Sequence, residues 1–189
     1  MVLTPTPIPG VQVIALTPLR DERGFFAVGF SRETFSQHGL NPHVEQMNLS
    51  HNAASGTLRG LHYQLAPYAE AKVVRCVKGA AFDVVVDLRP DSSSYCQWFG
   101  ITLDATDRRA LYIPEGVAHG FQTLTPDTEV LYTVSAPYTP SHCRGVRWDD
   151  PAFGIEWPSH AHRILHPRDR DYPDFDRAGH LRSLQEIPS

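Results

Sequence analysis

Short stretches of β-forming residues separated by turn residues fill the middle of the sequence, and they restrict the fold more than any other feature. They lie at residues 73–77, 80–88, 98–103, 110–113, 120–124 and 129–135, each bounded by Pro, Gly, Asp or Ser. Regularly spaced strands with turns between them are typical of an antiparallel sandwich or barrel rather than of alternating strands and helices. We therefore expect an all-β fold.

The first two of these stretches are predicted to form a hairpin across the Lys-Gly turn at residues 78–79. Within residues 80–88 the side chains alternate between two faces of a strand. One face carries Phe82, Val84, Val86 and Leu88, and the other carries Asp83, Val85 and Asp87.

The ends of the chain are less regular. Residues 11–16, with prolines on both sides, are predicted to form a short edge strand, and residues 25–30 a second strand. Residues 31–39 are predicted to form a short helix, because Ser31 can cap its first turn and Gly39 can end it. Residues 158–189 are rich in Pro, Arg, Asp and His, which indicates a loop with one short helix.

Composition limits the partners that this chain can have. With 189 residues and 41% hydrophobic positions it can bury a substantial core as one domain. A net charge of only -4, without runs of like charge, gives no indication of nucleic acid or an anionic membrane as partner. The N-terminus lacks a basic start followed by an apolar stretch, and nothing resembles a membrane span. We expect a soluble, unprocessed protein.

The cysteines indicate the compartment. Cys76, Cys96 and Cys143 are odd in number and show no paired spacing, so neither a disulfide framework nor a zinc knuckle is predicted. Free thiols fit a cytoplasmic location.

His62 is the first candidate for chemistry. It lies in the stretch LRGLHYQ (58–64), between a turn that contains Gly56 and a turn that contains Pro67. Imidazole can move a proton at neutral pH, although a single histidine in a half-buried strand more often has a structural role. Its function therefore depends on the residues that surround it.

Residues 60–79 and 114–119 resemble the two motifs of the cupin superfamily of small β-barrels. Metal-binding cupins use a His-x-His pair and a Glu from the first motif and a His from the second, a set suited to iron, manganese or nickel. His62 and His119 are present here, but Gln64 stands at the second His position and Lys72 where a carboxylate would be expected. A lysine ammonium repels a cation, so no metal site is predicted.

Two histidines, a lysine and no metal suit proton abstraction next to a carbonyl group. This chemistry needs a base, a cation or donor for the enolate oxygen, and an acid. His62 could be the base and Lys72 the oxyanion partner. Tyr132, which shares a strand face with Val130 and Val134, could be the acid. The alternatives are a core aromatic for Tyr132 and a solvated edge lysine for Lys72.

The sequence resembles the dTDP-4-dehydrorhamnose 3,5-epimerase family over nearly its whole length. The matching stretches, in the family's order, are residues 21–26, 46–50, 58–64, 72–79, 83–89, 113–121, 129–132, 138–140, 145–150 and 164–169. The resemblance implies a cupin-type jelly-roll barrel with a few short helices, as one domain over 1–189. Residues 1–50 would lie at a dimer interface, 51–150 would form the barrel and 151–189 a tail.

The resemblance also implies catalytic roles. His62 corresponds to the family's base, and Asp169 to the carboxylate that orients it. Tyr132 corresponds to the general acid on the opposite face of the sugar, and Lys72 and His119 to residues around the keto oxygen. The residues alone would place Asp169, in an Arg-rich tail, as a solvated charge.

Substrate contacts are implied in the same way. Arg59 corresponds to an arginine on the pyrophosphate, and Tyr138 to an aromatic wall of the nucleotide or sugar. Strict alternation would place Arg59 and His62 on opposite faces, but Gly60 could allow a bulge that brings both to one site.

The family is a homodimer that exchanges N-terminal strands between subunits. Its nucleotide contacts correspond to Gln46, Asn48, Arg23 and Phe26, the last two reaching over from the partner. The alternative for Phe26 is core packing, and for Arg23 a place in a surface turn.

The expected reaction is epimerisation of dTDP-4-dehydro-6-deoxy-D-glucose at C3 and C5 to dTDP-4-dehydro-L-rhamnose, without a cofactor because the ketone acidifies both carbons. Val28 and Cys143 stand where the family usually has Glu, which leaves open a mono-epimerase or another nucleotide sugar. A metal-dependent cupin, with His160 and His162 as a further pair, and a non-catalytic sugar-binding cupin are the alternatives from other classes.

Overall fold

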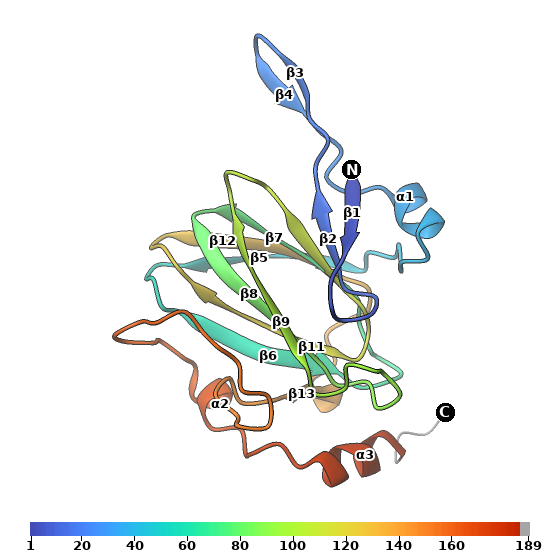
Figure 1. The fold of residues 1–189 in the computed structure, drawn as a ribbon, viewed down its shortest axis with the longest axis vertical. Helices are drawn as coiled ribbons and strands as arrows, with labels where there is room; N and C mark the ends of the chain where they lie inside the picture. Colours follow the sequence, from blue (N-terminus) through green and yellow to red (C-terminus); the bar gives the residue numbers. More distant parts are fainter. Residues whose placement is uncertain (186–189) are drawn as a thin grey trace.

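Two antiparallel β-sheets packed face to face form the body of the molecule (Figure 1), in a computed structural model that describes residues 1–185. The six-stranded sheet contains, in order, β1 (Val2–Pro5), β2 (Gln12–Ala15), β10 (Ala110–Ile113), β7 (Lys72–Lys78), β12 (Thr128–Val134) and β5 (Gln46–Asn52). The five-stranded sheet contains β13 (Cys143–Gly145), β6 (Leu58–Gln64), β11 (Val117–Thr123), β8 (Ala80–Asp87) and β9 (Trp98–Asp104). The predicted all-β, antiparallel fold is confirmed.

Within residues 1–185 four short helical segments lie outside the sheets: α1 (Arg32–Gln37), the 3-10 turn η1 (Pro140–His142), α2 (Pro167–Arg170) and α3 (Arg177–Gln185). The residues predicted to begin and end α1 do so in the structure. The Ser31 hydroxyl accepts a hydrogen bond from Thr34 N at 3.2 Å, and Gly39 follows the helix with φ +68°. The described part of the tail, residues 158–185, holds two helices where one was expected. Among the helices of residues 1–185 none has both the length and the apolar character that a membrane span needs.

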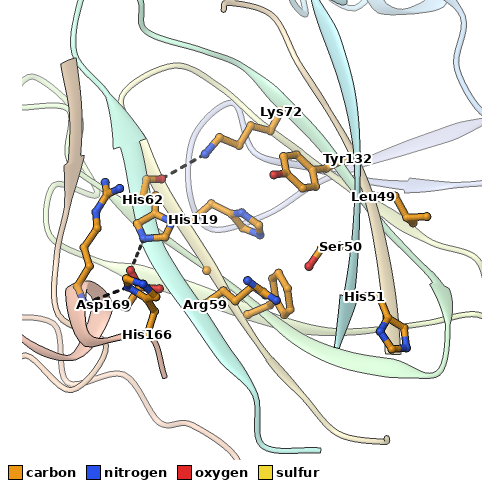
Figure 2. Close-up of a pocket in the computed structure, with 13 residues that line it drawn as sticks. Leu49, Ser50, His51, Arg59, His62, Lys72, His119, Tyr132, His166 and Asp169 are labelled. Carbon is orange, nitrogen blue, oxygen red and sulfur yellow. Dashed lines mark hydrogen bonds and ion pairs between the residues drawn. The ribbon is translucent and has the colours of Figure 1, made fainter. Parts of the chain in front are cut away.

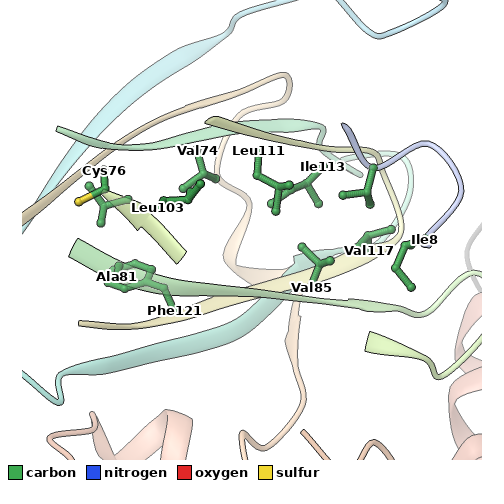
Figure 3. Close-up of a cluster of buried hydrophobic side chains, with 12 residues drawn as sticks. Ile8, Val74, Cys76, Ala81, Val85, Leu103, Leu111, Ile113, Val117 and Phe121 are labelled. Carbon is green, nitrogen blue, oxygen red and sulfur yellow. The ribbon is translucent and has the colours of Figure 1, made fainter. Parts of the chain in front are cut away.

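The main core lies between the two sheets (Figure 3). Val74 and Leu111 from the six-stranded sheet face Val85 and Val117 from the five-stranded sheet, and all four are almost fully buried. A second core lies on the outer face of the five-stranded sheet, where Val84, Val86 and Leu88 pack beneath segments of the tail. Strand β8 is therefore buried on both faces, which explains its run of valines.

The predicted hairpin of residues 73–77 and 80–88 is wrong. Strands β7 and β8 belong to different sheets, and Gly79 turns the chain from one sheet into the other with φ +73°. A Cβ at this position would lie 2.5 Å from Thr125 Oγ1. Alternation and a glycine turn occur both in hairpins and at corners between sheets, so the pattern could not separate the two.

The N-terminal prediction also needs correction. Strand β1 was not predicted, and it pairs with β2, so β2 lies inside the sheet between β1 and β10 rather than at its edge. The strand predicted at residues 25–30 ends at Phe26. Strands β3 (Leu19–Asp21) and β4 (Gly24–Phe26) form a hairpin that projects away from the barrel (Figure 1).

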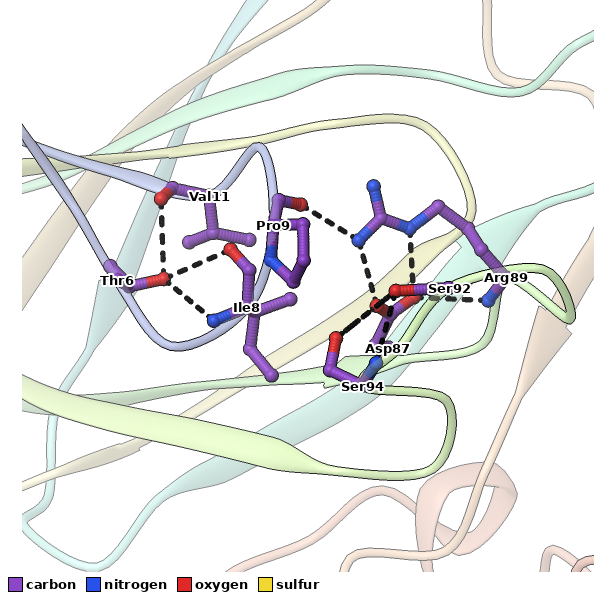
Figure 4. Close-up of polar contacts among 8 residues, drawn as sticks. All are labelled: Thr6, Ile8, Pro9, Val11, Asp87, Arg89, Ser92 and Ser94. Carbon is purple, nitrogen blue, oxygen red and sulfur yellow. Dashed lines mark hydrogen bonds and ion pairs between the residues drawn. The ribbon is translucent and has the colours of Figure 1, made fainter.

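A buried carboxylate fixes the N-terminal turn to the barrel (Figure 4). Asp87 is fully buried and accepts hydrogen bonds from Arg89, Ser92 and Ser94, while Arg89 Nη2 donates to the carbonyl of Pro9 at 2.8 Å. Burial acts to raise the pKa of Asp87, but these hydrogen bonds outweigh it and the pKa is lowered. The carboxylate therefore stays charged and holds residues 6–11 against the end of β8.

Helix α3 is attached to the barrel through His180. The imidazole is buried, stacks on Tyr95 at 5.9 Å between ring centroids and shares a 2.8 Å hydrogen bond between its Nδ1 and the Tyr95 hydroxyl. Its Nε2 has no partner among the described residues. Burial lowers the pKa of His180, so the folded protein holds this ring neutral.

Acidification should weaken the docking of α3. Below about pH 6.5 His180 is protonated in the unfolded chain but still neutral in the folded chain, because burial lowers its pKa in the folded state. The free energy of unfolding therefore falls as the pH drops towards the lowered pKa of the folded state. Urea unfolding at a series of pH values should show a weaker pH dependence for His180→Phe than for the wild type. His162→Gln, at an exposed position, should keep the wild-type dependence. Identical slopes for wild type and His180→Phe would contradict the assignment.

Candidate active site

A cavity of about 590 Å³ opens between strands of both sheets and helix α2 (Figure 2). Its lining comprises Leu49, Ser50, His51, Arg59, His62, Lys72, His119, Gly120, Phe121, Tyr132, His166, Arg168 and Asp169. A second cavity of about 260 Å³ shares His62, Lys72, Tyr132 and Arg168 with the first. The two cavities adjoin and form one cleft, and every catalytic candidate from the sequence lines it.

His62 and Asp169 meet although 107 positions separate them in the chain. Asp169 Oδ1 lies 2.7 Å from His62 Nε2, and Asp169 Oδ2 accepts a hydrogen bond from Gly60 N at 3.0 Å. Burial acts to raise the pKa of Asp169, but the hydrogen bond and charge of His62 and the Gly60 amide lower it overall. An ionised carboxylate can only accept, so Nε2 carries the proton and Nδ1 is the free base of the neutral ring. Asp169 is buried, contrary to the solvated position expected from the residues alone.

A bulge at Gly60 brings Arg59 and His62 to the same cavity. Arg59 is opposite Phe121 and His62 is opposite His119, so three steps along β6 match two steps along β11. Gly60 has φ +111°, and a Cβ there would lie 2.6 Å from the Cα of Gly120. The expected bulge is confirmed, and it requires glycine at this position.

Buried carboxylates also accompany the other two basic residues near His62. Lys72 Nζ lies 3.1 Å from Glu70 Oε1, and His119 Nε2 lies 2.9 Å from Asp83 Oδ2. The Lys72 side chain is only 8% exposed, so the alternative of a solvated edge lysine is wrong. Neither Glu70 nor Asp83 was identified from the sequence. For Asp83 the sequence did contain a signal, since Asp83 shares one face of β8 with Val85, and Val85 is in the core between the sheets.

Tyr132 lies on the wall opposite His62. It comes from β12 in the six-stranded sheet, whereas His62 comes from β6 in the five-stranded sheet, and Figure 2 shows both side chains directed into the space between them. Burial raises the pKa of Tyr132, and the charge of Glu70 adds to this effect while Arg59 opposes it. The phenol therefore keeps its proton at neutral pH and can act as an acid.

Two guanidinium groups in the cleft have no carboxylate partner within the described part of the chain. Arg59 Nε donates to Asn52 Oδ1 at 2.8 Å, and Arg168 Nε donates to the Tyr172 hydroxyl at 2.9 Å. Their positive charge is therefore uncompensated, and the cleft is suited to an anion such as a phosphate. The sequence prediction included Arg59 but not Arg168, which directly precedes Asp169.

The remaining predicted residues divide into two groups. Gln46, Asn48 and Tyr138 line the second cavity. Arg23 and Phe26 line neither cavity, because they lie on the projecting β3–β4 hairpin. Phe26 is 68% exposed, so the alternative of core packing is wrong for this residue, while Arg23 is an exposed turn residue paired with Asp21.

The two departures from the family pattern lie in different places. Cys143 lines the second cavity, with its Sγ 3.4 Å from Gln64 Oε1. Val28 follows the projecting hairpin and is exposed. Among residues 1–185 no group of three or more His, Cys, Asp or Glu residues is placed to hold a metal ion.

A sequence model described as dTDP-4-dehydrorhamnose 3,5-epimerase matches residues 5–177. The chain belongs to the dTDP-4-dehydrorhamnose 3,5-epimerase family. It is 42% identical to the dTDP-4-dehydrorhamnose 3,5-epimerase of Sinorhizobium fredii over 165 residues, 87% of this chain and 85% of that protein.

Solved structures of epimerases share the fold. The dTDP-4-dehydrorhamnose 3,5-epimerase of Elizabethkingia anophelis superimposes with a TM-score of 0.90 at 35% identity, over 93% of this chain and 96% of that one. ChmJ, a 3'-monoepimerase from Streptomyces bikiniensis solved with dTDP-quinovose, gives a TM-score of 0.86 at 34% identity, over 95% and 90%. The predicted cupin-type jelly roll and the resemblance to this epimerase family are confirmed.

Substitution of Gly60 by Ala should distort the site of this epimerase-family protein. The added Cβ overlaps the backbone of β11 and the residue must keep a positive φ, so we expect a loss of about 3 kcal/mol or more in the free energy of unfolding. Gly154→Ala is the matched control, because Gly154 has φ +60° but nothing within 4 Å of an added Cβ, and it should cost about 1 kcal/mol. Urea unfolding measures both, and equal losses would contradict the steric requirement at β6.

Proposed function

We propose that this protein is a dTDP-4-dehydrorhamnose 3,5-epimerase, which inverts C3 and C5 of dTDP-4-dehydro-6-deoxy-D-glucose to form dTDP-4-dehydro-L-rhamnose. The observation that carries this proposal is one cleft with a histidine base and a protonated tyrosine on opposite walls. Inversion at a carbon requires removal of a proton from one face and its return to the other, and His62 and Tyr132 suit these two steps.

The first step in the proposed mechanism is proton transfer from the carbon next to the ketone to Nδ1 of His62. Asp169 holds Nε2 and stabilises the imidazolium that forms. The negative charge that develops on the keto oxygen is stabilised by Lys72 and by His119, which line the same cavity. Tyr132 then donates its phenolic proton to the opposite face of the carbon. The ketone already acidifies both positions, so this route uses no cofactor.

The nucleotide part of the substrate is assigned to the rest of the cleft. We place the pyrophosphate at Arg59 and Arg168, whose charge is uncompensated, because forked donors match phosphate oxygens. The base and ribose are assigned to the second cavity, where Gln46 and Asn48 offer amide groups and Tyr138 an exposed aromatic ring. Cys143 also lines this cavity, so it is, with Val28, one of the two departures on which the choice of nucleotide sugar would depend.

A mono-epimerase is the second candidate, because a 3'-monoepimerase is among the proteins of similar structure. Both activities use the same base and acid, and they differ in whether one or two carbons reach them. Proton NMR of the 4-keto substrate in D₂O separates the two. Loss of the signals at both C3 and C5 supports the 3,5-epimerase, and loss at one carbon supports the mono-epimerase.

Removal of the base and removal of the acid should have different effects. His62→Asn should lower the rates of both deuterium incorporation and inversion by roughly 10²- to 10⁴-fold, because no group takes the carbon proton. Tyr132→Phe should still incorporate deuterium through His62 but form little inverted product, since the opposite face lacks a donor. NMR of the same reaction measures both events, and His38→Asn, at the exposed residue that follows α1, is the control. Inversion at the wild-type rate in His62→Asn would refute the assignment.

We also propose that the protein is a homodimer. The β3–β4 hairpin carries Leu19, 70% exposed, and Phe26, 68% exposed, while the edge strand β5 carries Met47 and Leu49, each 61% exposed. Exposed apolar side chains on an edge strand and on a projecting hairpin favour an interface in which the hairpin of one protomer buries the edge strand of another. In this arrangement the hairpin of one protomer lies over β5 of its partner and brings Arg23 and Phe26 to the partner's cleft.

Charged substitutions on the hairpin should separate the subunits. Leu19→Asp with Phe26→Asp should convert the dimer into a monomer in sedimentation velocity and weaken dTDP binding about tenfold or more, because a desolvated aromatic contact is lost. Ile164→Asp, at a 52% exposed apolar residue in the tail, should change neither property. A wild-type protein that sediments as a monomer would contradict the proposal.

We infer a cytoplasmic location from the cysteine chemistry. Cys76, Cys96 and Cys143 are all free thiols in the structure, the state that a reducing compartment maintains.

A further inference from the structure

Glu70 has no role in the mechanism above, although its carboxylate lies beside the proposed reaction centre. It belongs to the irregular segment between β6 and β7, and its side chain is only 11% exposed. One carboxylate oxygen lies 3.1 Å from Lys72 Nζ, and the other accepts a hydrogen bond from Gln64 Nε2 at 3.2 Å. A carboxylate so far out of water is stable only beside a positive charge and donors of this kind.

The amide of Gln64 fixes the position of this carboxylate. Gln64 is 3% exposed, its Nε2 also lies 3.0 Å from the carbonyl oxygen of Tyr68, and its Oε1 accepts from Thr139 N at 2.7 Å. These contacts connect the segment that carries Glu70 to the segment that precedes η1. The carboxylate is therefore part of a connected polar network and has one defined place relative to Lys72.

The charge of Glu70 also acts on Tyr132. An acid that donates a proton must retain it until the enolate has formed, and a nearby cation favours loss of that proton. The Lys72 ammonium lines both cavities together with Tyr132, and Arg59 lines the larger one. Burial raises the pKa of Tyr132 first, Glu70 raises it further, and Arg59 lowers it.

The titratable and charged groups that share the cleft with Tyr132 come from every element around it: His51, Arg59, His62, Tyr63, Glu70, Lys72, His119, Tyr138, Cys143, His166, Arg168 and Asp169, with Asp83 behind His119. Most of them are cations or imidazoles. Asp83 and Asp169 are each bonded to a histidine, so within the described residues Glu70 is the carboxylate that balances Lys72.

We propose that Glu70 is a positioning residue of this site, which holds the Lys72 ammonium at the place of the developing oxyanion and places a negative charge beside Tyr132 that opposes the charge of Arg59. This inference rests on the epimerase function proposed above. It separates two effects of one carboxylate: a contact that fixes Lys72, and a negative charge that adds to the effect of burial on the proton affinity of the Tyr132 phenol.

The test uses three variants of the full-length protein. Glu70→Gln removes the charge with little change of shape, Glu70→Asp keeps the charge but shortens the side chain, and Glu33→Gln changes an exposed glutamate on α1 as the matched control. The first measurement is kcat and KM for epimerisation from neutral to alkaline pH. The second is the titration of the Tyr132 phenol, followed by absorbance. It is obtained by subtracting the absorbance titration of the same protein with Tyr132→Phe from that of the protein with Tyr132. Urea unfolding reports whether each variant is folded.

Glu70→Gln should move the alkaline fall of kcat and the Tyr132 titration together to lower pH, and should lower kcat/KM at neutral pH about tenfold. Glu70→Asp should keep both titrations close to the wild type while kcat/KM falls, because the shorter carboxylate no longer reaches Lys72. Glu33→Gln should match the wild type in every measurement.

A folded Glu70→Gln protein with wild-type titrations would overturn the inference, even if its stability were lower, because a structural role alone does not move the proton affinity of Tyr132. If Glu70→Gln does not fold, Glu70→Asp decides, and a wild-type kcat/KM in that variant would overturn it. A wild-type protein that exchanges no carbon-bound hydrogen contradicts the proposed function instead, so the two failures are distinguishable.

Discussion

Charge held out of water between the two sheets is the constraint on which the rest of this structure depends. The side chains of Lys72 and His119 are at most 10% exposed and that of His62 is 38% exposed, and each of the three lies beside a carboxylate that is at most 11% exposed. An isolated charge in such a place costs several kcal/mol, and a correctly placed opposite charge offsets that cost. The three pairs therefore explain how a β-barrel core can hold a group of basic side chains and remain folded.

The pairs also explain why distant parts of the chain must come together. Asp169 is carried by the tail, Asp83 by β8 and Glu70 by the segment between β6 and β7. The tail reaches His62 only because α2 lies against β6 at the bulge, where the Gly60 amide holds the second oxygen of Asp169. A backbone irregularity in one strand thus aligns the base, its carboxylate and Arg59 in a single cleft.

The balance of charge along the cleft fits the family to which the chain belongs. Lys72 has an anionic partner beside the proposed reacting carbon, and the ring nitrogen of His62 and the phenol of Tyr132 are the groups that we propose to exchange protons. Arg59 and Arg168 line the same cavity and have no carboxylate partner among the described residues, as a site for a pyrophosphate requires. Val28 and Cys143 lie outside the base and acid pair, so these departures bear on the substrate more than on the reaction.

The sequence by itself determined the all-β class, the ends of α1, and the family with its candidate base and acid, because alternation, capping residues and ordered motifs are local properties of the chain. It did not distinguish a hairpin from a corner between sheets at Gly79, since both need the same turn residue. Glu70, Asp83 and Arg168 were missed, and Asp169 was placed only by resemblance, because a charged side chain has the same local signal on a surface as in a cavity. Only the tertiary structure decided which carboxylates are buried, since burial depends on segments that meet from distant parts of the chain.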